Sequence, residues 1–143
     1  MKLNTQYHDV LNYEEKDIIT FKRGIPGFDH LRKFILVPVE ENNSFYILHS
    51  IEDNTIGIVV VSPFDLFKNY EFDLSEDKAA ELKIKSEEDV FVVNTVTLNS
   101  KLEHITINLK APIVININQN VGEQLILDKA EYPIKYPLFK GGV

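Results

Sequence analysis

A short apolar run near the middle of the chain reads Ile56-Gly57-Ile58-Val59-Val60-Val61. Successive side chains of a strand point to opposite faces, so a strand with this sequence is apolar on both sides. A β-branched run of this length is typical of a central strand that is covered on both faces. Gly57 predicts a bulge or a close backbone approach within this strand.

Similar runs precede this central one. Short segments rich in β-branched or aromatic residues occupy positions 18–21, 34–39 and 45–50. Turn-forming sequences separate the runs at 24–27, 40–43 and 52–54. Strands joined by such short turns predict sequential antiparallel pairing.

The runs that follow alternate apolar and polar residues. Residues 90–98 place Asn94 among valines, and both 105–110 and 113–118 alternate isoleucine or leucine with polar or smaller residues. This period of two predicts an antiparallel meander with one face open to water. Pro112 cannot donate to a strand ladder, so we expect it at a bend or an edge.

Helix signals are few. Ser75 is a capping residue followed by Glu76 and Asp77, which predicts one short surface helix. Ser62-Pro63 predicts a single helical turn with proline at its first position. The sequence therefore predicts a mostly β protein: a compact antiparallel β-barrel or sandwich-like single domain over residues 1–143, with one or two short surface helices.

Composition narrows the possible partners and compartments. The chain has 143 residues, no cysteine and a net charge of -7, and its only arginines are Arg23 and Arg32. Readers of nucleic acid display Lys and Arg toward phosphates, so we predict no direct nucleic-acid binding. The acidity suits a basic protein partner, although it also serves solubility alone. The N-terminus lacks an apolar signal segment and no apolar run approaches a membrane span, so we expect a cytoplasmic protein that does not enter the membrane.

Residue types that serve in catalysis or metal binding are present, but they do not stand at the sequence spacings typical of such sites. The four histidines are His8, His30, His49 and His104, and no two share a metal-ligand spacing. We expect His49 and His104 to be turn or surface residues. No GxSxG motif is present, and none of the serines stands in a sequence pattern that would activate it as a nucleophile. The sequence therefore predicts no enzyme, no metal site and no cofactor.

One acidic stretch stands out among several. Glu71 and Asp73 alternate with the aromatic residues Tyr70 and Phe72, and Glu76 and Asp77 follow. Protein interfaces combine aromatic side chains with a polar rim, so this stretch is the best candidate for a partner-binding patch. Two plainer readings stay open: the carboxylates form a solvated face, and the two aromatic rings point inward from an alternating strand.

Several segments together resemble the flagellar assembly factor family known as FliW. Phe21-Lys22-Arg23-Gly24-Ile25-Pro26-Gly27-Phe28 is similar to the signature F-x-x-G-[LI]-P-G-F of that family. Thr106-Ile107-Asn108-Leu109-Lys110-Ala111-Pro112-Ile113-Val114-Ile115-Asn116 is similar to its N-L-x-A-P-[IV]-x-[IV]-N block. Leu48-His49-Ser50 is similar to its L-Q-S segment, with histidine where glutamine is usual. Further matches lie at 62–63, 70, 124–127 and 132–133, so the resemblance covers about residues 15 to 140.

The resemblance implies a cytoplasmic regulator without catalytic activity. Members of the family bind flagellin before export and bind CsrA, a small basic dimer that blocks translation of flagellin mRNA. The resemblance also makes His49, Asn108 and Pro112 candidates for partner contacts. For Gly24, Pro26, Gly27 and Phe28 we expect a structural turn, because glycine accepts positive φ and proline fixes φ. Asn108 and Asn116 are expected to hydrogen-bond at turns or edges.

A second reading of the sequence is a small β-barrel that binds a small molecule or an oligonucleotide at its mouth. An enclosed apolar cavity would favour the small molecule. Exposed aromatic side chains beside basic ones would favour the oligonucleotide. Sequence alone does not decide which surface meets which partner.

Overall fold

The computed structural model describes residues 1–5, 10–39, 44–128 and 131–139. His8 and the turn expected at 40–43 lie outside these residues. The strands are β1 (Lys2–Asn4), β2 (Val10–Asn12), β3 (Ile19–Thr20), β4 (Lys33–Pro38), β5 (Phe45–Ser50), β6 (Gly57–Val61), β7 (Val90–Thr97), β8 (Thr106–Ile107), β9 (Ile113–Asn116), β10 (Val121–Gln124) and β11 (Tyr136–Pro137). The helices are α1 (Pro63–Leu66) and α2 (Glu76–Glu81), with single 3₁₀ turns η1 (Glu15–Asp17), η2 (Glu87–Asp89) and η3 (Leu102–His104).

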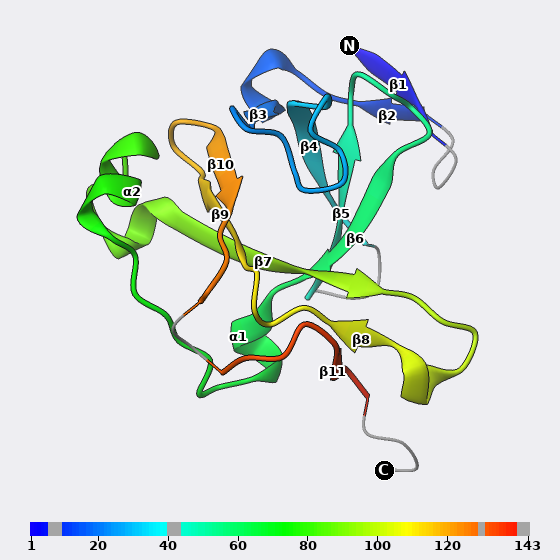
Figure 1. The fold of residues 1–143 in the computed structure, drawn as a ribbon. Helices are drawn as coiled ribbons and strands as arrows, with labels where there is room; N and C mark the ends of the chain where they lie inside the picture. Colours follow the sequence, from blue (N-terminus) through cyan, green and yellow to red (C-terminus); the bar gives the residue numbers. More distant parts are fainter. Residues whose placement is uncertain (6–9, 40–43, 129–130, 140–143) are drawn as a thin grey trace.

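Seven strands form a closed barrel. The order around the ring is β3-β4-β5-β6-β7-β9-β10, and β10 returns to β3 (Figure 1). Every pair in the ring is antiparallel except β3 and β10, which pair in parallel through Val121 and Thr20. Outside the ring, β8 pairs with the C-terminal end of β7, and β11 pairs with β8. Strands β1 and β2 form a separate two-stranded ribbon. The predicted mostly β fold is confirmed.

The central strands lie where the sequence predicts them. Runs 34–39, 45–50 and 56–61 become β4, β5 and β6, which pair sequentially in antiparallel register. Gly57 pairs directly with His49 in that register. The bulge predicted at Gly57 is therefore wrong, because the ladder between β5 and β6 continues through it.

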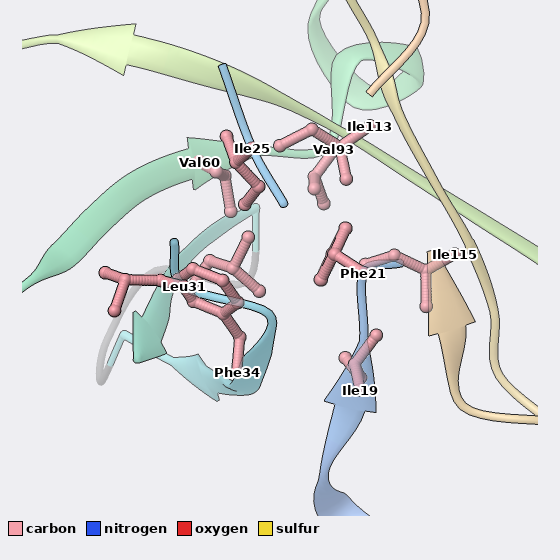
Figure 2. Close-up of a cluster of buried hydrophobic side chains, with 10 residues drawn as sticks. Ile19, Phe21, Ile25, Leu31, Phe34, Val60, Val93, Ile113 and Ile115 are labelled. Carbon is pink, nitrogen blue, oxygen red and sulfur yellow. The ribbon is translucent and has the colours of Figure 1, made fainter. Parts of the chain in front are cut away.

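The barrel interior is filled by large apolar side chains. Phe21 and Phe34 are fully buried and pack edge to face, with ring centroids 5.5 Å apart. Figure 2 shows isoleucine, leucine and valine side chains, from strands of the ring and from the loop between β3 and β4, converging on these two phenyl rings. Aromatic pairs in this geometry add to the stability that burial itself provides.

A second layer covers the outside of part of the barrel. Val92 of β7 and Val114 of β9 face outward and pack with Leu82, just after α2. All four residues of β9 are consequently buried. The prediction of one wet face for 113–118 is therefore wrong for this strand, because α2 and its flanking residues cover that face.

Both predicted helices are present. The Ser75 hydroxyl accepts a hydrogen bond from the Lys78 amide at 3.2 Å, which satisfies one free donor of α2. Pro63 begins α1, as expected, although the Ser62 side chain makes no capping bond there.

Asn116 fastens the end of α2 to the barrel. Its Nδ2 donates to the carbonyl oxygens of Leu82 and Lys83 at 2.8 and 3.0 Å. Its Oδ1 accepts from the amides of Asn118 and Gln119 at 3.0 and 3.2 Å. One buried amide thus satisfies the helix end and the β9–β10 turn together.

Residues 24–28 form the tight turn that the sequence predicts. The Phe28 amide donates to the Ile25 carbonyl at 2.6 Å, and Gly27 has a φ of +92°. With Pro26 before it, this is the pattern of a type II turn. Gly24 also has a positive φ of +66°, and a Cβ there would lie 2.7 Å from the Asp29 carbonyl oxygen. Glycine is therefore required at both ends of the turn.

The Glu52 carboxylate fixes the start of β4 and predicts a pH dependence of stability. It accepts hydrogen bonds from the amides of Arg32 and Lys33 at 2.6 and 2.8 Å, which hold its pKa below the usual 4.5. The stabilisation is complete above the pKa of unfolded Glu52 and is lost as the pH falls through the folded value. Glu52→Gln should therefore lower the urea midpoint at pH 7, and at an acid pH well below 4.5 its difference from the wild type should shrink.

The matched control for this measurement is Glu15→Gln. The Glu15 side chain is exposed and accepts no backbone hydrogen bond among the described residues. An equal midpoint for wild type and Glu52→Gln at both pH values would show that the Glu52 contacts add nothing to stability.

Candidate functional site

Several grooves open on the surface of the barrel, and two of them have a volume of about 620 Å³ each. They share no lining residue. We call the first the motif groove, because its walls contain the turn at 24–28 and residues 108–111. We call the second the acidic groove, because it contains the stretch 70–73.

The motif groove joins segments that are far apart in the sequence. Ile25, Pro26 and Phe28 form one wall, and Asn108, Lys110 and Ala111 form another. The remaining lining residues come from β6, β7, the end of β10 and the segment after it: Ile58, Thr95, Val96, Thr97, Gln124, Ile126, Asp128 and Ile134. Ile126 and Ile134 are 60% and 58% exposed. The fold thus brings the two longest family-like motifs to one apolar surface.

A bulge between β8 and β9 shapes this groove. Both strands pair with β7: Ile107 faces Val96, and Ile113 faces Val93. Residues 108–112 therefore lie opposite only Asn94 and Thr95, and the extra residues bend away from the ladder. The continuous strand predicted at 105–110 is reduced to Thr106–Ile107 for this reason.

Two buried polar side chains hold the bulge. Asn94 donates from Nδ2 to the Asn108 carbonyl at 2.8 Å and to the Tyr70 hydroxyl at 3.2 Å. The Tyr70 hydroxyl in turn donates to the Leu109 carbonyl at 2.7 Å. Carbonyl groups that leave a ladder need other donors when they are buried, and these side chains supply them.

Asn108 fixes the same bulge from within. Its Oδ1 accepts from the amides of Lys110 and Ala111, both at 3.1 Å. The expected role of Asn108 in turn hydrogen bonding is confirmed, and Asn116 does the same at the β9–β10 turn. Pro112 lies buried at the bend between β8 and β9, where its carbonyl accepts from the Leu125 amide at 2.8 Å.

The acidic groove lies beside α1, α2 and the start of β7. Glu71, Asp73 and Glu87 contribute carboxylates, and Lys85 contributes the single amine. Apolar and small side chains complete the lining: Phe64, Tyr70, Phe72, Leu74, Ala79, Ile84, Ser86, Val90, Val92 and Val114. Residues 70–73 of the predicted patch therefore line a concave surface, whereas Glu76 and Asp77 lie outside it.

The rings of Tyr70 and Phe72 do not point from a strand, because residues 70–73 have no strand structure. Tyr70 is only 4% exposed and packs against Tyr132 with ring centroids 4.7 Å apart. Burial raises the pKa of Tyr70 to about 12, so its hydroxyl keeps its proton and remains a donor. Tyr70 supports the groove from beneath, whereas Phe72 is only partly buried.

His49 lies away from both grooves. It is fully buried on β5, with Nδ1 2.8 Å from the Ser50 carbonyl oxygen. The prediction of a turn or surface position is wrong for His49, because it stands within a paired inner strand. His104 is exposed on η3, as expected.

Sequence reasoning missed several lining residues. Ile134 and Lys110 enter the motif groove, and Lys85 and Glu87 enter the acidic groove, only through the three-dimensional path of the chain. Tyr132 belongs to the family-like match at 132–133, and its hydroxyl also accepts from the Glu71 amide and donates to the Glu71 carbonyl, both at 3.1 Å. No pattern of neighbouring residues in the sequence predicts these contacts.

Within the described ranges, no three or more acidic or histidine side chains come together in a group that could hold a metal ion. No helix of those ranges is long and apolar enough to span a membrane.

Comparison with known proteins gives a consistent result. The family model described as FliW protein matches residues 2–138. The chain is 75% identical to a flagellar assembly factor FliW of Clostridium kluyveri (strain ATCC 8527) over 143 residues, covering 100% of this chain and 99% of the relative. It is 58% identical to a protein of the same description from Clostridium tetani (strain Massachusetts / E88), covering 98% of this chain and 97% of the relative.

A solved structure agrees with these sequence matches. The crystal structure of the flagellar assembly factor FliW is 38% identical to this chain, superposes with a TM-score of 0.92, and both chains are covered completely. The resemblance inferred from the motifs is thereby confirmed, and the chain belongs to the FliW family of flagellar assembly factors.

Proposed function

We propose that this protein is a cytoplasmic regulator that binds flagellin and, when it is free of flagellin, binds and antagonises the translational regulator CsrA. Membership of the FliW family is the observation that carries the proposal. Capture of CsrA would relieve repression of flagellin mRNA translation. Because the regulator is freed when flagellin leaves the cell, flagellin export would be coupled to flagellin synthesis. The role needs binding sites for two proteins that either overlap or are coupled through a shared two-state element, and it needs no catalytic group.

The net charge of -7 supports the second partner. CsrA is expected to be basic, and opposite charge accelerates encounter and selects the partner. The two separate grooves give the chain two concave surfaces that proteins of different chemistry can occupy. Both are open to solvent, so neither resembles the enclosed apolar cavity expected for a small-molecule carrier.

Isothermal titration with flagellin and with CsrA from the same cell tests the proposal. We expect both to bind the wild-type chain, and we expect saturating flagellin to prevent CsrA binding. Absence of binding to both proteins would overturn the proposed function.

Charge steering makes a separate kinetic prediction. The association rate constant with CsrA should fall by roughly tenfold between low salt and about 0.15 M salt, because screening shortens the reach of the acidic surface. The dissociation rate constant should change much less. Stopped-flow measurement across a salt series checks this, and an association rate that does not depend on salt would remove electrostatic steering from the account.

A further inference from the structure

We infer that the acidic groove binds a cationic segment of a protein partner, with an apolar side chain of that segment seated between Phe64 and Phe72. This inference rests on the proposed function, since it assigns a surface to the basic partner. Most of its lining residues belong to the segment that joins α1 to α2, the segment after α2 and the start of β7. Figure 1 shows how these elements are arranged.

The charge of the groove is unbalanced. Three carboxylates, those of Glu71, Asp73 and Glu87, face one amine, that of Lys85. All four side chains are exposed, and none of the ion pairs within the described residues involves any of them. The groove therefore offers carboxylates to a cation from outside.

A neighbouring cluster shows what a balanced acidic surface looks like in this protein. Lys78 lies 2.5 Å from Glu123 and 3.2 Å from Glu81, and Arg23 contacts the same two carboxylates. The hydrogen bond with Glu123 raises the pKa of Lys78, which keeps its amine protonated. Here the chain supplies its own cations, whereas in the acidic groove it does not.

The groove is also apolar, which selects a protein segment over a small cation. Phe64 is 45% exposed, and its ring lies 5.9 Å from that of Tyr70. Phe72, Ile84 and Val90 are partly buried beside it. Partly exposed aromatic side chains in a concave site are the usual anchors of protein interfaces. A segment with an apolar residue flanked by lysine or arginine matches both properties.

The walls are held before any partner arrives. The Tyr132 hydroxyl accepts from the Glu71 amide and donates to the Glu71 carbonyl, both at 3.1 Å. On the other wall, Asp89 accepts from the amides of Lys85 and Ser86 at 3.0 and 3.1 Å. A site ordered in advance loses less entropy on binding. The motif groove, by contrast, has one lysine and one aspartate and no net charge to select a cation.

The test compares two triple variants of equal net charge. Glu71→Gln with Asp73→Asn and Glu87→Gln neutralises the acidic groove while keeping its shape. Glu15→Gln with Glu103→Gln and Glu131→Gln removes the same charge from exposed positions outside both grooves. Each variant is titrated with CsrA by calorimetry at low salt, after its thermal midpoint has been shown to match the wild type.

We expect the groove variant to bind CsrA at least about tenfold more weakly than the wild type, and the control variant to stay within about twofold. Phe64→Ala should weaken CsrA binding by a similar factor, because it removes the aromatic anchor of the groove. Equal losses in the two triple variants would show that only net charge acts and would overturn the assignment. If the wild-type chain itself fails to bind CsrA, the CsrA part of the proposed function is overturned, and the flagellin titration then decides whether the rest stands.

Discussion

Phe21→Ala should lower the free energy of unfolding by about 4 kcal/mol, the loss typical of emptying a large aromatic site in a core. Phe21 has no exposed surface and packs edge to face on Phe34 in the barrel interior. It follows β3, one of the two strands that close the ring. Because single domains are stable by only about 5–15 kcal/mol, this variant should be close to unfolding at 37 °C. Urea denaturation followed by circular dichroism measures the loss.

Two further variants sharpen this measurement. Phe139→Ala, at a site 42% exposed, should change the free energy by less than about 0.5 kcal/mol. A Cβ on Gly122 would lie 2.8 Å from Cε2 of Phe21, so Gly122→Ala should destabilise the wild type. The same change should cost less in the Phe21→Ala background, where the ring is gone. A loss below about 1 kcal/mol for Phe21→Ala would contradict the packing described here.

Asn116→Ala should lower the free energy of unfolding by about 3 kcal/mol, because it leaves several partly buried backbone groups without partners. The lost bonds are those to the carbonyls of Leu82 and Lys83 and from the amides of Asn118 and Gln119. Hydrogen exchange of the amides in α2 should also become faster, since the end of this helix is no longer fastened to β9.

Gln119→Ala is the matched control for Asn116→Ala. It lies in the same turn, its side chain is exposed, and its backbone amide keeps the bond to Asn116. We expect a change within about 0.5 kcal/mol. Equal effects of the two substitutions would mean that the turn, and not the Asn116 side chain, holds α2.

The parts of the fold that local signals specify could be predicted from the sequence. Strands β4, β5 and β6 follow from β-branched runs between turns, α2 from its Ser75 cap, and the type II turn from Pro26 and Gly27. In each case the residues that decide the structure are close together in the chain. The same holds for the family motifs.

What could not be predicted depends on contacts between distant residues. The apparent wet face of 113–118 is buried because Leu82, just after α2, packs with Val114. His49 is buried because β5 is an inner strand. The bulge at 108–112 depends on hydrogen bonds from Asn94 and Tyr70, which no spacing reveals. For the same reason, the sequence gives the residues 70–73 of the acidic groove but not Lys85 or Glu87 on its other wall.

The pairing of β3 with β10 also has a consequence for biosynthesis. The ring joins residue 20 to residue 121, so the first strands cannot complete their barrel until most of the chain has left the ribosome. Until then, the apolar faces of β4, β5 and β6 have no closed interior to enter. Such late, non-local closure slows folding and prolongs exposure of strand edges. The nascent protein should therefore remain prone to aggregation during translation until the last third of the chain has been synthesised and closes the barrel.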